Sequence, residues 1–111
     1  MIECREHPRI AIDLPVFFST NHNTDIRQGT VFDVSAGGCA VTSSVSVAPG
    51  TGVRLLIRAV ELGSPITVQS AAVRWARHGE FGVEFLDLAE LDRNRLQRLL
   101  NAASSISIRQ N

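Results

Sequence analysis

Two short patterns in this chain carry the residues best suited to hold an anion or a purine. The first is Arg5-Glu6-His7-Pro8-Arg9, which spaces two arginines four positions apart near the N-terminus. The second is Asp33-Val34-Ser35-Ala36-Gly37-Gly38, which brings a carboxylate, a hydroxyl and glycines close together. An arginine side chain presents a planar fork of N–H donors that fits a phosphate group or the O6/N7 edge of guanine. The first pattern therefore suits phosphate and guanine groups, and the second adds acceptors beside a tight turn.

The two patterns differ in how often they occur by chance. A chain this rich in arginine contains about one RxxxR match by chance. Arg54 and Arg58 form a second match, which we interpret as an exposed strand face. The pattern DxSxxG is rarer, with on the order of 0.06 chance matches expected in a chain of this length. Its ordinary alternative is turn chemistry, in which aspartate and serine bond to the backbone beside glycine.

The elements that must position these residues are mostly strands. Short apolar segments separated by glycine, proline and asparagine clusters are typical of a barrel or a sandwich. The spacing of apolar residues changes near the C-terminus, where leucines recur as on one face of a helix. Asp87 and Glu90 are placed as a capping box at the start of this helix. The predicted strands are residues 14–20, 26–34, 39–44, 53–62, 66–77 and 80–86, and the predicted helix is 87–103. Residues 1–13 are predicted to form a flexible arm.

Composition limits the classes of function. The chain has 111 residues, 44% of them hydrophobic, which suits one domain with one core. Its formal net charge is zero, so it lacks the uniform basic field expected of a nucleic-acid-binding protein. No signal peptide and no long apolar run is visible, so we expect a cytoplasmic protein without membrane insertion. Two cysteines, Cys4 and Cys39, make no disulfide framework and no zinc-ligand spacing.

The order of these patterns resembles the PilZ domain family. Members have an N-terminal RxxxR, then [D/N]xSxxG, then a late pair of strands. Asp13-Leu14-Pro15-Val16 is similar to the family's entry into its first strand, and Val73-Arg74-Trp75-Ala76-Arg77 with Phe81-Gly82-Val83-Glu84-Phe85 is similar to the late pair. The resemblance covers nearly the whole chain. It implies an all-β fold with a C-terminal helix, namely a six-stranded antiparallel β-barrel of the split-barrel type.

The resemblance also implies the ligand, cyclic di-GMP, and a role as a sensor that is not an enzyme. Arg5 and Arg9, on the arm, would close over the phosphates and guanines. Asp33 and Ser35 are two apart, so in a regular strand they share the outer face, while Phe32 and Val34 face the barrel interior. Asp33 would accept the N1 and N2 hydrogens of a guanine. Ser35 would bond a phosphate or a base edge.

Three further residues complete the predicted site. Gly38 would permit close approach of the ligand, or adopt a backbone angle closed to other residues. Trp75 would stack on a base, with a core position as an equal alternative. Arg77 would add a charged contact, or else pair weakly with Glu80 at the surface.

Several alternatives stay open from sequence. The chain is either a sensor whose arm orders on ligand binding and that contacts an unidentified effector protein, or an adaptor that keeps the fold without the ligand. Many relatives carry an arginine where this chain has Cys4, a position that bears on whether one or two ligand molecules bind, and its loss favours one. No nucleophile with a base and an orienting group indicates an enzyme. No cofactor or metal is predicted.

Overall fold

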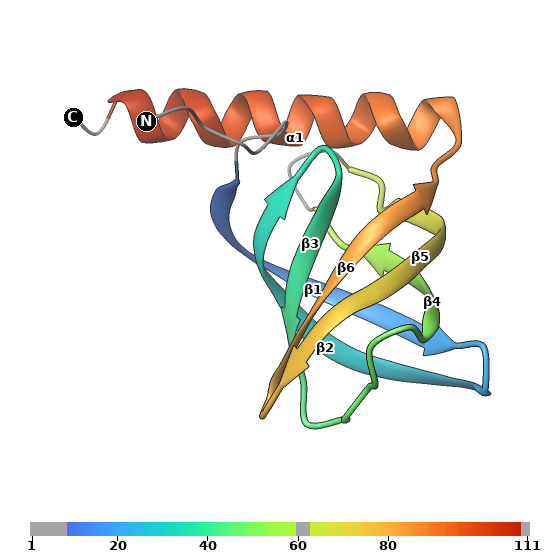
Figure 1. The fold of residues 1–111 in the computed structure, drawn as a ribbon. Coiled ribbons are helices and arrows are strands. Elements are labelled where there is room, and N and C mark those ends of the chain that lie inside the picture. The colour runs from blue at the N-terminus through green and yellow to red at the C-terminus, as the bar shows by residue number, and fades with distance from the viewer. Residues whose placement is uncertain (1–8, 60–62, 110–111) are drawn as a thin grey trace, which may run out of the picture.

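The computed structural model describes residues 9–59 and 63–109, with side chains described as far as Ala103. Six antiparallel strands close into a barrel, and one helix follows them, as Figure 1 shows. The all-β fold with a C-terminal helix is therefore confirmed. The elements are β1 (Ile10–Thr20), β2 (Asn23–Ser35), β3 (Gly38–Thr42), β4 (Gly52–Ile57), β5 (Ile66–Arg77), β6 (Glu80–Asp87) and α1 (Glu90–Arg109).

The strands follow from alternating apolar residues that fill the barrel. In β4, Val53, Leu55 and Ile57 are buried while Arg54 between them is exposed. Such alternation places every second side chain on the inner face of a strand. Phe18 of β1 and Phe81 of β6 meet in this interior as an edge-to-face pair, with ring centroids 5.2 Å apart. The core is therefore built mainly from β-branched side chains, together with these two rings and several leucines, and all six strands contribute to it.

The order of strands around the barrel decides where the site forms. It runs β1-β2-β3-β6-β5-β4, and β4 pairs back with β1 to close the barrel. β3 thus lies beside β6, and Gly38 faces Glu84 across this pair although 46 positions separate the two residues in the sequence. The turn between β2 and β3 is consequently held against the last strand before α1 (Figure 1).

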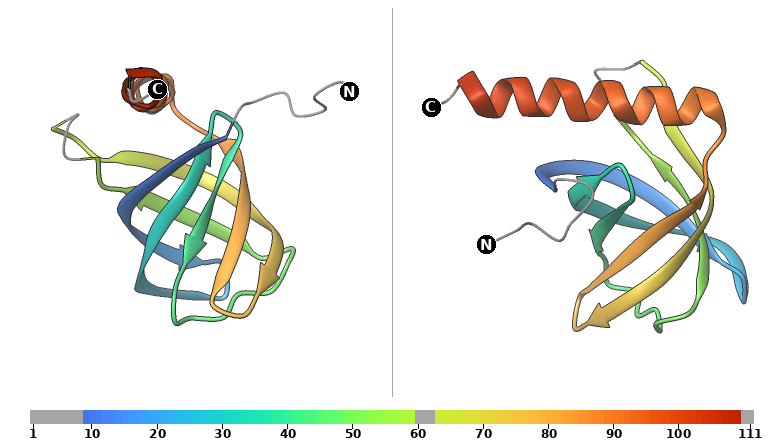
Figure 2. Two further views of the ribbon diagram at one scale, coloured as in Figure 1. Left: turned by 90° about the vertical axis from the view of Figure 1, so that its left-hand side faces the viewer. Right: turned by 45° about the horizontal axis from the view of Figure 1, so that its top comes forward.

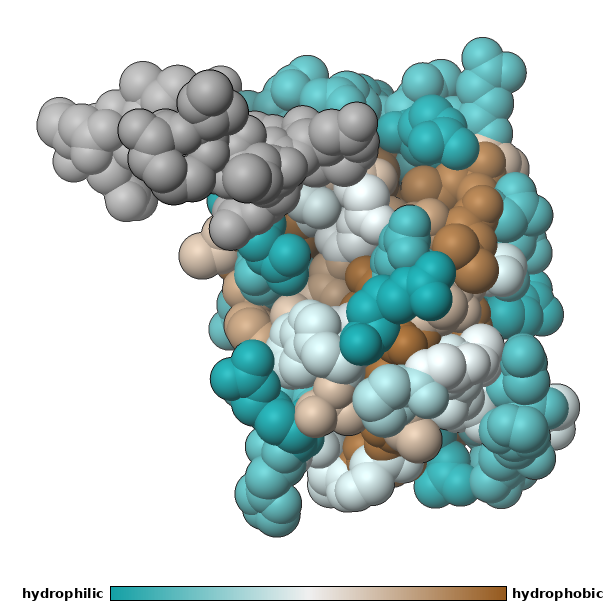
Figure 3. Space-filling model, viewed as in Figure 1, coloured by the Kyte–Doolittle hydropathy of each residue, from teal (hydrophilic) through white to brown (hydrophobic). Residues whose placement is uncertain are grey.

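The helix packs across one end of the barrel, as two further views show in Figure 2. Its buried leucines, Leu96, Leu99 and Leu100, join the barrel core. Asp92 is only 8% exposed, and its Oδ1 accepts a hydrogen bond from the backbone N–H of Thr67 at 2.9 Å. Figure 3 shows hydrophilic residues along the outer side of α1 and hydrophobic residues beneath it. The first half of α1 is therefore fixed to the barrel by both apolar packing and a buried hydrogen bond.

Several predicted boundaries were wrong. Strand β1 begins at Ile10, with Ile10 and Ala11 already paired with β2, so residues 10–13 belong to the strand and not to an arm. Asp87 ends β6, and α1 begins at Glu90, so the predicted Asp87–Glu90 capping box does not form. The helix continues to Arg109, past its predicted end at residue 103. Within the described residues, no helix combines the length and apolar character needed to cross a membrane.

The predicted inward position of Phe32 was also wrong. Val31 and Val34 are buried in the core, whereas Phe32 between them is only half-buried. The pairing of β2 with β3 slips between Val31 and Asp33, which is the signature of a β-bulge. Because the bulge adds a residue to one strand, the simple alternation assumed from sequence breaks at this point.

Candidate functional site

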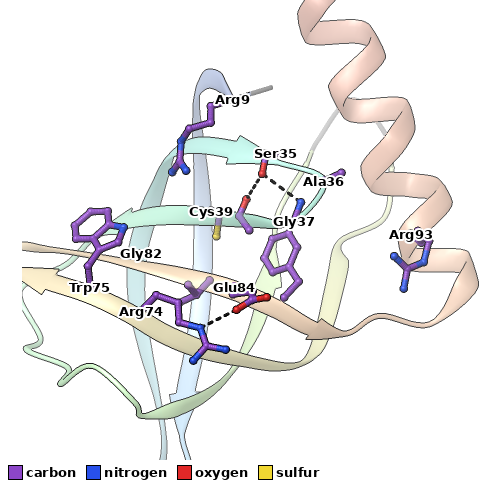
Figure 4. Close-up of a pocket in the computed structure, with 13 residues that line it drawn as sticks. Arg9, Ser35, Ala36, Gly37, Cys39, Arg74, Trp75, Gly82, Glu84 and Arg93 are labelled. Atoms are coloured by element: carbon purple, nitrogen blue, oxygen red, sulfur yellow. Dashed lines mark hydrogen bonds and ion pairs between the residues drawn. The ribbon is translucent and has the colours of Figure 1, made fainter. Parts of the chain in front are cut away.

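A cavity of about 500 Å³ opens on the barrel surface beside the β2–β3 turn. Its walls come from this turn, from β5 and β6, and from the start of α1 (Figure 4). This volume lies within the usual range for small-molecule sites. The lining residues are Arg9, Ser35, Ala36, Gly37, Gly38, Cys39, Arg74, Trp75, Gly82, Val83, Glu84, Phe85 and Arg93.

The β2–β3 turn is held by Ser35. The Ser35 hydroxyl accepts a hydrogen bond from the Gly37 N–H at 3.2 Å and donates to the Gly38 carbonyl at 3.4 Å. The N–H of Phe85 in β6 donates to the Gly37 carbonyl at 2.9 Å. Ser35 lines this cavity on the barrel surface while Val34 before it lies in the core, which agrees with the predicted outer face, although Ser35 is only 7% exposed. Its hydroxyl bonds the backbone of its own turn, which makes this wall of the cavity rigid.

At Gly38, strands β3 and β6 lie too close together for a larger residue. A Cβ atom at Gly38 would collide with the backbone carbonyl oxygen of Val83 in β6. Positive φ angles among the described glycines occur at Gly50, Gly63 and Gly79, so Gly38 does not use a left-handed conformation. Of the two reasons predicted for this glycine, the special backbone angle was wrong. The structure adds another reason, which is close contact between β3 and β6.

Arg9 and Asp33 form an ion pair at the rim of the cavity. Arg9 Nε donates to Asp33 Oδ2 at 2.6 Å, and the two side chains are 36% and 26% exposed. Asp33 itself does not line the cavity, whereas Arg9 does. Because the bond uses Nε, the two Nη groups of Arg9 remain available to another acceptor. Asp33 therefore orients the guanidinium whose free side borders the cavity.

Trp75 of β5 is partly exposed and lines the cavity on the barrel surface. A Cβ at Gly82, on the neighbouring strand β6, would collide with the indole, so the ring covers this glycine. Arg77 does not line the cavity; its guanidinium carbon lies over the indole, 4.7 Å from the ring centroid. Arg77 also pairs with Glu80 at 3.6 Å, as the surface alternative predicted. Trp75 is therefore a partly exposed aromatic platform and not a core residue.

Three charged residues of the cavity were missed by sequence analysis: Arg74, Glu84 and Arg93. Arg74 Nε donates to Glu84 Oε1 at 2.7 Å across the β5–β6 pair. Arg93 comes from α1, where its Nη2 is 3.5 Å from the carbonyl oxygen of Leu88. Arg74 lies inside a motif noted from sequence, so it could have been included. No sequence signal places Arg93 near the turn, because its position depends on how α1 packs.

Arg5, the remaining predicted ligand residue, lies outside the described residues. The same holds for Cys4 and His7. Among residues 9–59 and 63–109, no group of His, Cys, Asp or Glu side chains is arranged to hold a metal ion. Of the predicted site residues, Arg9, Ser35, Gly38 and Trp75 line the cavity. Asp33 and Arg77 do not line it, but Asp33 pairs with Arg9 and Arg77 lies over Trp75.

Cys39 forms part of the cavity floor and is buried to 1% exposure. Burial disfavours the charged thiolate and raises the pKa of the Cys39 thiol from 9.0 to about 12. The nearby Asp33 carboxylate raises this pKa further, and the Arg9 guanidinium partly opposes the shift. The expectation that Cys39 is a small buried hydrophobic residue agrees with this environment.

Comparison with known proteins decides the family. The family model for the PilZ domain matches residues 3–102. The chain belongs to the PilZ family. No curated protein matches the chain.

Solved structures contain the same fold. The inhibitor of motility MotI/DgrA from Bacillus subtilis is 25% identical, with a TM-score of 0.71 over 90% of this PilZ chain and 53% of its own length. The present chain thus spans about half of that protein. The PilZ domain of YcgR from Escherichia coli, solved with c-di-GMP, is 12% identical, with a TM-score of 0.78 over 97% of each chain. The PilZ domain of CeSA from a cellulose-synthesizing bacterium is 22% identical, with a TM-score of 0.68 over 86% of this chain and 96% of that one.

Proposed function

We propose that this PilZ chain binds cyclic di-GMP in the cavity beside the β2–β3 turn and acts in the bacterial cytoplasm as a sensor that contacts an effector protein. The observation that carries the proposal is the meeting of Arg9, Arg74, Arg93 and the Trp75 indole around one cavity. Two relatives support it: the YcgR domain was solved with this nucleotide, and MotI/DgrA is an inhibitor of motility.

The chemistry of the cavity suits the two phosphates and two guanines of this ligand. Guanidinium groups bind phosphate and the guanine O6/N7 edge through paired hydrogen bonds. Arg9 and Arg74 each use Nε for a carboxylate, which leaves their Nη groups for the ligand. The partly exposed indole of Trp75 offers a surface on which a purine can stack, in the place where Arg77 now lies over the ring.

In this proposal the residues that precede β1 would act as the arm and complete the site. In this proposal Arg5 closes over the bound nucleotide, while Arg9 is already held at the rim by Asp33. A ligand can shift the arm only if it binds the closed form better than the open one, since ordering the arm costs conformational entropy. The closed arm changes the surface presented to the effector. We assign no catalytic role to any of these residues.

Calorimetric titration with cyclic di-GMP tests the proposal. Arg9→Ala removes a charge-assisted contact worth about 1.5–3 kcal/mol, so affinity should fall about ten- to a hundredfold. Arg54→Ala is the matched control, because Arg54 belongs to the second RxxxR match and is exposed on β4, away from the cavity. Its affinity should stay within about twofold of wild type, the expectation for a distant surface charge.

A wild-type protein that gives no heat and no rise in melting temperature at high ligand concentration would establish the alternative, a ligand-independent adaptor. Chromatography of the nucleotide after incubation separates binding from turnover. Recovery of intact cyclic di-GMP is the expected result, and conversion to a linear product would overturn the sensor assignment.

A further inference from the structure

The three arginines that line the cavity are not in the same state. Arg9 pairs with Asp33 at 2.6 Å, and Arg74 pairs with Glu84 at 2.7 Å. Arg93 has no carboxylate partner among the described residues, and its hydrogen bond to the Leu88 carbonyl, at 3.5 Å, is at the limit of such contacts. Among the arginines that line the cavity, Arg93 is therefore the one whose charge no described carboxylate neutralises. An anionic ligand can bind Arg93 without competing with a carboxylate.

The backbone that carries Arg93 is firmly placed. Leu88, at the start of the connection into α1, is buried, and Phe85 just before it bonds the β2–β3 turn. Asp92, the neighbour of Arg93 on α1, is buried and accepts the Thr67 N–H. Successive residues on a helix point in different directions, so Asp92 anchors the helix while Arg93 stays at the cavity. The position of Arg93 is thus set by the barrel and not by its own contacts.

The view in Figure 4 shows how the cations are distributed. Arg93, on α1, lies on one side of the cavity, and Arg9 and Trp75 lie on the other, with the β2–β3 turn between them. A ligand with a single anionic group can satisfy one side only. A ligand with two phosphates joined in a ring carries an anionic group toward each side, which suits this division of charge.

From this arrangement we infer that Arg93 is a phosphate-binding residue, through which the bound nucleotide contacts α1 as well as the barrel. The inference rests on the proposed function and extends it beyond the two sequence motifs. The nucleotide joins three separate parts of the fold: the rim at Arg9, the β2–β3 turn and the first turns of α1. Ligand binding consequently stabilises the junction between β6 and α1, in addition to any effect on the arm.

The test is calorimetry with cyclic di-GMP on the full chain, comparing Arg93→Gln with Arg98→Gln. Both variants remove one arginine charge from an exposed position of α1, but only Arg93 lines the cavity. Arg93→Gln should lower affinity about tenfold or more, the usual effect of losing a charge-assisted bond, and Arg98→Gln should change it by less than about twofold. Arg93→Lys, which keeps the charge without the fork, should recover part of the loss.

A second measurement separates contact with the ligand from a structural role. The melting temperature of Arg93→Gln without ligand should equal that of wild type. With saturating ligand, amide exchange in residues 90–96 should slow in wild type and in Arg98→Gln, and less in Arg93→Gln.

Two failures are distinguishable. Wild-type binding together with equal affinities for Arg93→Gln and Arg98→Gln overturns this inference and leaves the proposed function standing. Absence of wild-type binding overturns the proposed function itself.

Discussion

Two arginine–carboxylate pairs flank the cavity with nearly the same geometry but in different surroundings. Arg9 Nε to Asp33 Oδ2 is 2.6 Å, and Arg74 Nε to Glu84 Oε1 is 2.7 Å. The side chains of the first pair are 36% and 26% exposed, whereas those of the second are 55% and 53% exposed. Water screens an exposed pair strongly, so equal distances do not imply equal coupling.

The pairs also differ in which partner faces the ligand. Arg9 lines the cavity and Asp33 does not, whereas Arg74 and Glu84 both line it. Asp33 therefore supports a cation without adding negative charge to the cavity wall. Glu84 adds a negative charge to the wall on which we propose that phosphates bind. We therefore expect Asp33 to assist anion binding, because it lies outside the cavity, and Glu84 to oppose it, because it lines the cavity.

The largest effect expected from this comparison concerns Cys39, which lies beside the less exposed pair. Its thiol pKa is raised from 9.0 to about 12, so at pH 8 the thiolate fraction is roughly a thousandfold below that of a free cysteine. We expect negligible labelling of native Cys39 by a thiol reagent at pH 8 in a Cys4→Ser background. Unfolding in urea should restore rapid labelling, and fast labelling of the native protein would contradict the described burial.

The raised pKa of the Cys39 thiol also determines how the free energy of unfolding changes with pH. A thiol with a raised pKa in the folded state contributes stability that is complete below pH 9. This contribution is lost as the pH rises through about 12. The free energy of unfolding should therefore decrease across this alkaline range, and less so in Cys39→Ala.

A smaller effect tests whether Asp33 acts through Arg9. Asp33→Ala should weaken cyclic di-GMP binding by about tenfold, because the guanidinium loses the bond that orients it. In an Arg9→Ala background the same change should have little further effect, since coupled residues are not additive. Calorimetry on the four proteins of this cycle measures the coupling. Full additivity would mean that Asp33 contacts the ligand directly, as the sequence analysis predicted.

The smallest effect concerns Glu84. Glu84→Gln removes a negative charge from the cavity wall and keeps an oxygen that can accept from Arg74 Nε. We expect affinity for cyclic di-GMP to rise by about two- to threefold at low salt, and the gain to shrink as salt is added. Glu80→Gln, which alters the partner of Arg77 outside the cavity, is the control. A loss of affinity in Glu84→Gln would mean that its charge assists binding.

Sequence reasoning was most successful where the signal is local. The exposed position of Arg54 on β4 and the residue boundaries of β5 follow from neighbouring side chains, and the structure confirms both, although β4 ends at Ile57, before Arg58 and before its predicted end at residue 62. The turn at Ser35 to Gly38 is also local, since its hydrogen bonds join residues two or three apart. The failures fall at Phe32, where a bulge shifts the register, and at the start of α1, where the capping role was assigned to Asp87, the last residue of β6.

The sequence by itself determined the strand-rich core, the tight turn that follows Asp33 and the presence of a C-terminal helix. Each depends on residue types within a few positions of one another, which is the range over which propensity and hydrogen bonding to the local backbone act. Only the tertiary structure decided that Arg74, Glu84 and Arg93 share a cavity with that turn. Their meeting depends on β3 pairing with β6 and on α1 docking at the barrel end, and burial of apolar surface drives such contacts without regard to distance along the chain.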